Sequence, residues 1–208
     1  MAAGFSVEMP RLPGHGTSVE DLASATWTQW VDEALRAYDV LAEHCSNVAV
    51  VGLSMGGALS AYLSARRVVA GCVFINPVVK PPAPEIIDGL EQLLAAGIES
   101  YEAIGSDIKR EGVVGTSYDA TPLRAAKSLF EGLAQVQRDL ERITAPCLLF
   151  SSREDHVVTP DNGDELVARV RGPVERVWLE NSYHVATLDF DQDLVTALTV
   201  DFLARVLR

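Results

Sequence analysis

A single serine, Ser54, stands among glycines in the stretch Gly52-Leu53-Ser54-Met55-Gly56. An apolar run ends just before it, and a helical pattern begins just after it. This pattern is typical of a nucleophile elbow, a sharp turn from strand to helix that exposes a hydroxyl at its apex. Bulky side chains two positions before and after the serine would collide in such a turn, so we expect both flanking glycines to be sterically required. Ser54 is therefore the candidate nucleophile.

A serine hydroxyl needs a base to remove its proton and a carboxylate to orient that base. After a nucleophile elbow, the acid and the histidine are expected in that order along the chain, each just past a strand. His184 is the best placed of the four histidines, because it lies in a polar turn after an apolar run. The others are His15 and His44, which precede the serine, and His156, which follows the strand expected at 147–151.

The candidate acids lie in the segment that leaves the apolar run at 147–151. Glu154 and Asp155 come first, whereas Asp161 and Asp164 suit the start of a helix. The carboxyl ends of parallel strands meet at one edge of an open α/β sheet, and ligands bind there. The sequence therefore predicts that a hydroxyl, a carboxylate and an imidazole converge at this edge.

Short apolar runs predict the strands that would position these groups, and segments of helical spacing separate several of them. The expected strands are residues 5–9, 48–51, 72–76, 147–151 and 174–179. The runs at 48–51 and 147–150 are continuously apolar, as in parallel strands that are covered on both faces. The alternation of strand and helix predicts the α/β class, with a mostly parallel sheet and helices on both faces.

One block interrupts the alternation. Residues 81–145 begin in a proline-rich segment and then hold several helical patterns and no convincing strand. We expect them to form a small helical cap inserted into an α/β core made of residues 1–80 and 146–208. Extra core helices are the alternative for this block.

Composition narrows the possible partners and location. The net charge of −12 repels phosphate backbones and anionic lipid, which disfavours nucleic acid and membrane surfaces as partners. The apolar runs fall short of membrane length, so we expect no stable membrane insertion. Three scattered cysteines are too few for a disulfide framework or a zinc site. We expect a cytoplasmic protein without a signal peptide or a bound metal.

Three motifs carry a family resemblance. The stretch GLSMGG matches the elbow, REDHVVTP the acid loop and NSYHVATLD the histidine loop of the bacterial carboxylesterase and monoacylglycerol lipase branch of the α/β-hydrolases. The sequence resembles this branch from about residue 5 to its C-terminus, including a cap of the right length. The loop LPGHGTS and the helix before the elbow strand add to the match.

The resemblance implies hydrolysis of carboxylic esters with short to medium acyl chains, such as monoacylglycerols. The reaction would proceed by acylation of a serine and deacylation by water, without metal or cofactor. By position in the motifs, Ser54 is the nucleophile, His184 the general base and Asp155 the group that orients it. The backbone N–H of Met55 is one oxyanion donor.

The sequence departs from the family at its start. Members normally begin with a strand that ends in His-Gly and an aromatic residue or glycine, and a backbone N–H there is the second oxyanion donor. This sequence contains no such segment. We therefore predict a hydrolase that lacks its N-terminal strands, as in an incomplete form of a longer chain.

The missing strand lies between the segment at 5–9 and the elbow strand in the family's sheet. The two edges it would leave must pair directly, bind another chain, as in a homodimer, or stay exposed. An alternative function follows: a catalytically impaired hydrolase fold that acts as a binding or assembly module.

Overall fold

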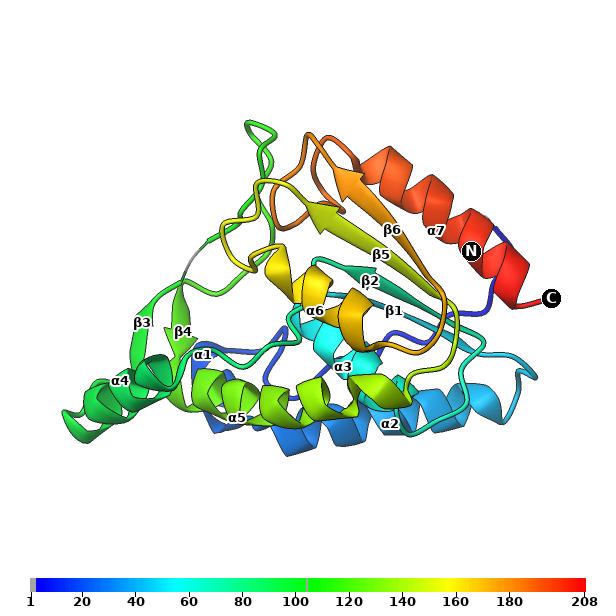
Figure 1. Ribbon diagram of the computed structural model, residues 1–208. Coiled ribbons are helices and arrows are strands. Elements are labelled where there is room, and N and C mark those ends of the chain that lie inside the picture. Colours follow the sequence, from blue (N-terminus) through cyan, green and yellow to red (C-terminus); the bar gives the residue numbers. More distant parts are fainter. Residues whose placement is uncertain (1–2, 104) are drawn as a thin grey trace.

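A parallel four-stranded sheet forms the centre of the computed structural model, which describes residues 3–103 and 105–208 (Figure 1). The strand order is β1-β2-β5-β6, and each neighbouring pair is parallel. The strands are β1 (Ala49–Leu53), β2 (Gly71–Ile75), β5 (Cys147–Ser152) and β6 (Val174–Leu179). The prediction of an α/β fold with a mostly parallel sheet is confirmed.

Helices cover both faces of this sheet. On one face, α2 (Trp27–Ala42), α3 (Met55–Ser64) and α5 (Leu123–Asp139) pack against one another over a large apolar core. On the other face, Figure 1 shows α7 (Gln192–Val206), whose Phe202 belongs to the same buried apolar cluster as the sheet residues Val73 and Phe150. The remaining helices are α1 (Val19–Ser24), α4 (Pro84–Ala95), the short η1 (Leu140–Arg142) and α6 (Asp161–Arg169).

Local sequence explains how α2 begins and how it packs. The Thr26 hydroxyl accepts from the N–H of Gln29, and the Gln29 side chain accepts from the N–H of Thr26, so two free donors of the first turn are satisfied. The helix buries Trp27, and α5 crosses directly over this indole. A Cβ at Gly132 of α5 would come within 2.4 Å of the ring, so the glycine allows the close approach.

The prediction of a strand at residues 5–9 is wrong. These residues form no regular secondary structure, and the side chains of Val7 and Met9 are 65% and 88% exposed. The sequence alternates as a half-buried strand would. However, backbone N–H and C=O groups stay in a strand only where a neighbouring strand takes up their hydrogen bonds.

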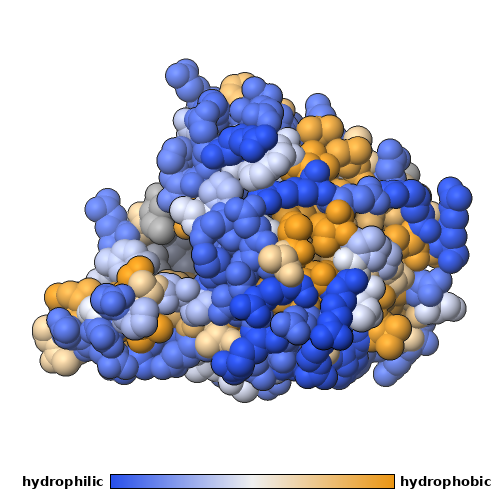
Figure 2. Space-filling model, viewed as in Figure 1, coloured by the Kyte–Doolittle hydropathy of each residue, from blue (hydrophilic) through white to orange (hydrophobic). Residues whose placement is uncertain are grey.

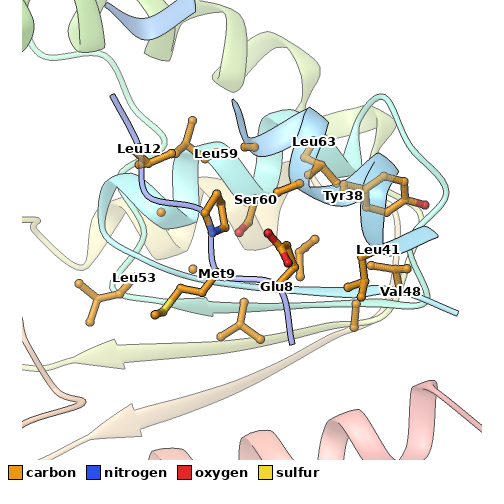
Figure 3. Close-up of a pocket in the computed structure, with 18 residues that line it drawn as sticks. Glu8, Met9, Leu12, Tyr38, Leu41, Val48, Leu53, Leu59, Ser60 and Leu63 are labelled. Atoms are coloured by element: carbon orange, nitrogen blue, oxygen red, sulfur yellow. The ribbon is translucent and has the colours of Figure 1, made fainter. Parts of the chain in front are cut away.

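β1 consequently lies at the edge of the sheet, with β2 as its neighbour. A groove of about 320 Å³ runs beside it, between the segment that contains Glu8 and Met9 and the helices α2 and α3 (Figure 3). Val51 of β1 is 48% exposed. Within residues 3–103 and 105–208, β2 is the only strand that pairs with β1.

The segment predicted as a helical cap, residues 81–145, contains two strands that the sequence did not indicate. The strands β3 (Ser100–Glu102) and β4 (Ala120–Pro122) pair as a two-stranded antiparallel ribbon next to α4 and α5. Each strand has three residues, and β3 is exposed throughout. Such short strands do not show the alternation of side chains that identifies a strand in a sequence.

Polar and apolar residues occupy different areas of the visible surface. Figure 2 shows apolar residues gathered over the sheet between α6 and α7 and again at the end where α4 lies, with polar residues between these two areas. In the described part of the chain, no helix has the length and apolar character needed to cross a membrane. All three cysteines are free; Cys72 and Cys147 are buried, and Cys45 is half-buried.

Candidate active site

Ser54 lies at the apex of the turn from β1 to α3, as the motif predicted. Its backbone has φ 54° and ψ −118°, a strained conformation for a residue with a side chain. Hydrogen bonds fix it: its N–H donates to the Ile75 carbonyl (3.0 Å), and its carbonyl accepts from the N–H of Val78 (3.2 Å). Among the described residues, the Ser54 hydroxyl has no hydrogen-bond partner, so it stays available for chemistry.

The steric prediction for the flanking glycines is correct on one side only. A Cβ at Gly52 would lie 2.1 Å from the Gly56 carbonyl oxygen, so this position requires glycine. A Cβ at Gly56 would meet no atom within 4 Å, so the expectation there is wrong. The close contact falls one residue later, because a Cβ at Gly57 would lie 2.5 Å from the Pro77 ring.

These contacts predict opposite results for two matched substitutions. In Gly52→Ala the new methyl group meets backbone atoms that cannot move independently, and we expect a loss of about 2 kcal/mol or more in the free energy of unfolding. In Gly56→Ala the methyl group enters open space, and we expect a change within about 0.5 kcal/mol. Urea unfolding of both variants measures this difference. Equal destabilisation by the two substitutions would contradict the account of the elbow.

His184 and Asp155 form a buried pair. The imidazole Nδ1 lies 2.8 Å from Asp155 Oδ2, and the two side chains are 7% and 1% exposed. The other carboxylate oxygen accepts from the N–H groups of Val157 (2.9 Å) and Val158 (2.7 Å). Asp155 is therefore held in place by its own loop, and the histidine keeps Nε2 free for a proton.

The rival acids lie elsewhere. Glu154 is exposed and faces Lys109, with 3.4 Å between the charged atoms. Asp161 and Asp164 occupy the first turn of α6, where they pair with Lys80 and Arg176. Of the carboxylates that the sequence offered, the structure brings only Asp155 to His184.

The other histidines make different contacts. His15 lies against Trp30, with 5.8 Å between ring centroids, and lines the same cavity as Ser54. His156 points away from Asp155: its Nδ1 lies 2.8 Å from Asp107, and its side chain is 57% exposed. His44 is exposed just beyond the end of α2.

Asn76, which the sequence analysis did not single out, joins the ends of the strands to the histidine loop. It follows β2 with φ 42°, and its side-chain NH₂ donates to the His184 carbonyl (2.8 Å) and the Ser152 hydroxyl (2.9 Å). Its Oδ1 accepts from the Ser152 N–H (2.8 Å). Ile75, the residue before Asn76, accepts the hydrogen bond from the Ser54 N–H. The end of β2 therefore binds both the serine and the histidine loop.

A largely apolar cavity of about 600 Å³ opens at the elbow. Ser54 and Met55 form one wall of this cavity, and the α5 side chains Leu129 and Phe130 form another. Met55 is the first residue of α3, so its N–H is not needed by the helical hydrogen bonds and can bind an oxygen of a ligand. Within residues 3–103 and 105–208, no group of three or more His, Cys, Asp or Glu side chains could hold a metal ion.

Comparison with known proteins identifies the family of the chain. The chain matches the protein family described as serine aminopeptidase, S33 (Hydrolase_4) over residues 1–191. It is 38% identical to a thermostable monoacylglycerol lipase of Bacillus sp. (strain H-257), with 98% of this chain and 81% of the relative covered. It is 26% identical to a carboxylesterase of Bacillus subtilis (strain 168), with 98% and 82% covered.

Solved structures show the same relationship. A chain from a study of LipS and LipT, two metagenome-derived lipolytic enzymes, superimposes with a TM-score of 0.92 and 37% identity, covering 98% of this chain and 84% of that one. A Paleococcus ferrophilus monoacylglycerol lipase shares the fold with a TM-score of 0.65 at 18% identity, covering 84% and 75%. The chain thus belongs to the Hydrolase_4 family of the α/β-hydrolase superfamily.

Proposed function

We propose that this protein hydrolyses carboxylic esters with Ser54 as nucleophile, His184 as general base and Asp155 as the group that orients the base. The buried 2.8 Å contact between His184 Nδ1 and Asp155 carries the proposal, because a neutral imidazole that donates from Nδ1 to this carboxylate has Nε2 as its proton acceptor. The strained elbow that presents an unpartnered hydroxyl supports it.

In the first half of the reaction, Ser54 Oγ attacks the ester carbonyl while its proton passes to His184 Nε2. The imidazolium that forms is stabilised by Asp155, and it returns the proton to the leaving alcohol as the C–O bond breaks. In the second half, water attacks the acyl-serine with His184 again as base. The acid is released and Ser54 recovers its proton.

The oxyanion that forms during both halves would be bound by the Met55 N–H at the start of α3. An oxyanion donor of this kind contributes about 10²–10³-fold to turnover.

The cavity at the elbow supports an acyl group as the part of the substrate that is buried. Its walls are mainly apolar, and its volume of about 600 Å³ is large enough for a medium acyl chain. The relatives named monoacylglycerol lipase and carboxylesterase point to the same class of substrate. We propose monoacylglycerol-like esters with short to medium acyl chains.

A fluorophosphonate probe combined with p-nitrophenyl esters of increasing acyl length tests this function. We expect the probe to modify Ser54 alone, since it is the hydroxyl in the strained turn, and the esters to be turned over. Modification of another serine, or no modification together with no turnover, would refute the proposed function.

The open edge of β1 favours a second candidate, a binding or assembly module that accepts an additional strand. The groove beside β1 gives such a strand space, and a second copy of the chain would form a homodimer there. Sedimentation at increasing protein concentration distinguishes the two candidates. A dimer without ester turnover supports this module, whereas a monomer with turnover supports the enzyme.

A further inference from the structure

Asp107 belongs to the cap segment between β3 and β4, yet its hydrogen bonds reach the two core loops that carry Asp155 and His184. Its Oδ2 accepts from the backbone N–H of His184 (3.1 Å) and of His156 (3.1 Å). Its Oδ1 lies 2.8 Å from His156 Nδ1, and its carbonyl accepts from the N–H of Val185 (3.1 Å). The side chain is 12% exposed, so water competes little for these contacts.

The charge state of Asp107 suits this role. Burial raises the pKa of Asp107, but hydrogen bonds from the His156 side chain and from the N–H groups of His156 and His184 outweigh it and lower the pKa overall. Asp107 is therefore a carboxylate at neutral pH, and both of its oxygens act as acceptors.

Within the part of the chain that the structure describes, three segments together bind every hydrogen-bonding group of His184 except Nε2. Asp107 accepts from its N–H, Asn76 donates to its carbonyl, and Asp155 holds Nδ1. The direction of the free nitrogen is set by these three contacts. Asp107 supplies the one that comes from the cap.

A second carboxylate also connects the cap segment to the histidine loop, and this one belongs to the core. Asp189 is fully buried and accepts from the backbone N–H groups of Lys109 (2.7 Å) and Arg110 (3.0 Å) in the cap segment. It also accepts from the N–H of Tyr183, next to His184 (2.9 Å). A carboxylate of the cap segment thus binds the histidine loop, and a carboxylate that follows the histidine loop binds the cap segment.

We propose that Asp107 is a positioning residue that couples the seating of the cap on the core to the direction of the His184 imidazole. This inference rests on the ester-hydrolysis function proposed above, in which His184 is the base. A displacement of about 1 Å in a catalytic group lowers turnover by up to about 10²-fold. The effect should fall on kcat, because Asp107 is not among the residues that line the cavity at the elbow.

Three substitutions separate the position of the acceptors from their charge. Asp107→Ala removes both acceptors. Asp107→Glu keeps the charge but moves the carboxylate by one methylene. Asp107→Asn keeps an acceptor for the two backbone N–H groups, and its NH₂ can donate to His156 Nδ1 once that ring adopts the other tautomer.

We expect Asp107→Ala and Asp107→Glu to lower kcat for a p-nitrophenyl ester by about 10–100-fold, with KM within about threefold of the wild type. Asp107→Asn should retain kcat within about threefold. Glu154→Gln is the matched control, since it removes an exposed ion pair between the core and Lys109 of the cap segment, and it should leave kcat unchanged. If Asp107→Ala does not fold, the proposal is tested by comparing kcat of Asp107→Glu with kcat of Asp107→Asn.

Wild-type kcat in Asp107→Glu would overturn the proposal, as would equal losses in Asn and Glu, because either result shows that acceptor position is not what matters. Hydrogen exchange gives a readout that does not depend on turnover. Peptides covering 153–158 and 180–188 should exchange faster in the Glu variant than in the Asn variant. A wild-type chain that neither hydrolyses esters nor reacts with the fluorophosphonate refutes the enzyme itself, whereas unchanged exchange in an active enzyme refutes only the role of Asp107.

Discussion

Replacing Ser54 with alanine is expected to lower ester turnover by at least about 10⁴-fold, because no other group replaces the attacking oxygen. Initial rates with a p-nitrophenyl ester at saturating substrate measure this loss. Wild-type rates in Ser54→Ala would remove Ser54 from the mechanism.

Ser54→Gly is the control for folding in this experiment. Its backbone adopts φ 54° without a steric penalty, so we expect the variant to be as inactive as the alanine variant yet more stable than the wild type by up to about 1 kcal/mol. Activity and thermal stability would then change in opposite directions. Loss of both in the glycine variant would mean that inactivity reflects misfolding.

Asp155→Asn is expected to lower kcat by about 10⁴-fold while leaving the fold intact. The carbonyl oxygen of the new amide will face the N–H groups of Val157 and Val158, because that oxygen position accepts two hydrogen bonds. The NH₂ group must then face His184 Nδ1 and donate to it. The imidazole is forced to carry its proton on Nε2, where it cannot accept the proton of Ser54.

Glu154→Gln is the matched comparison, since it changes the neighbouring carboxylate, which is exposed and faces Lys109. We expect its kcat to equal that of the wild type. The two variants should unfold at similar urea concentrations, which shows that the difference is chemical. A fully active Asp155→Asn together with an inactive Glu154→Gln would assign the orienting role to Glu154.

The sequence was informative where local constraints are strong. The continuous apolar run 147–150 lies in the buried strand β5, and Asp155, the acid predicted just beyond it, contacts His184. Ser54 lies in the turn that its glycine pattern predicted, although the second close contact falls at Gly57 rather than Gly56. The histidine loop was placed by its polar turn after β6.

What the sequence missed depends on contacts between distant segments. The short apolar run at 5–9 predicted a strand, but among the described residues no neighbouring strand takes up its hydrogen bonds. Asn76 directly follows an apolar run, and a polar residue at the end of a buried strand is a candidate for a buried hydrogen-bonding group. Its partners could not be identified from the sequence, because they lie 76 and 108 positions away along the chain. Asp107 gave no local signal at all, since its role arises from the docking of the cap.

The packing of α5 has a consequence for exchanging caps between relatives. The helix lies within the insertion that the sequence delimits, but its Leu133 and Val136 are buried in the same core as the sheet residue Phe74. Its Gly132 also accommodates the indole of Trp27. A graft that alters substrate preference should therefore replace the ribbon and α4 and retain α5, because a graft that removes α5 would remove part of the scaffold as well.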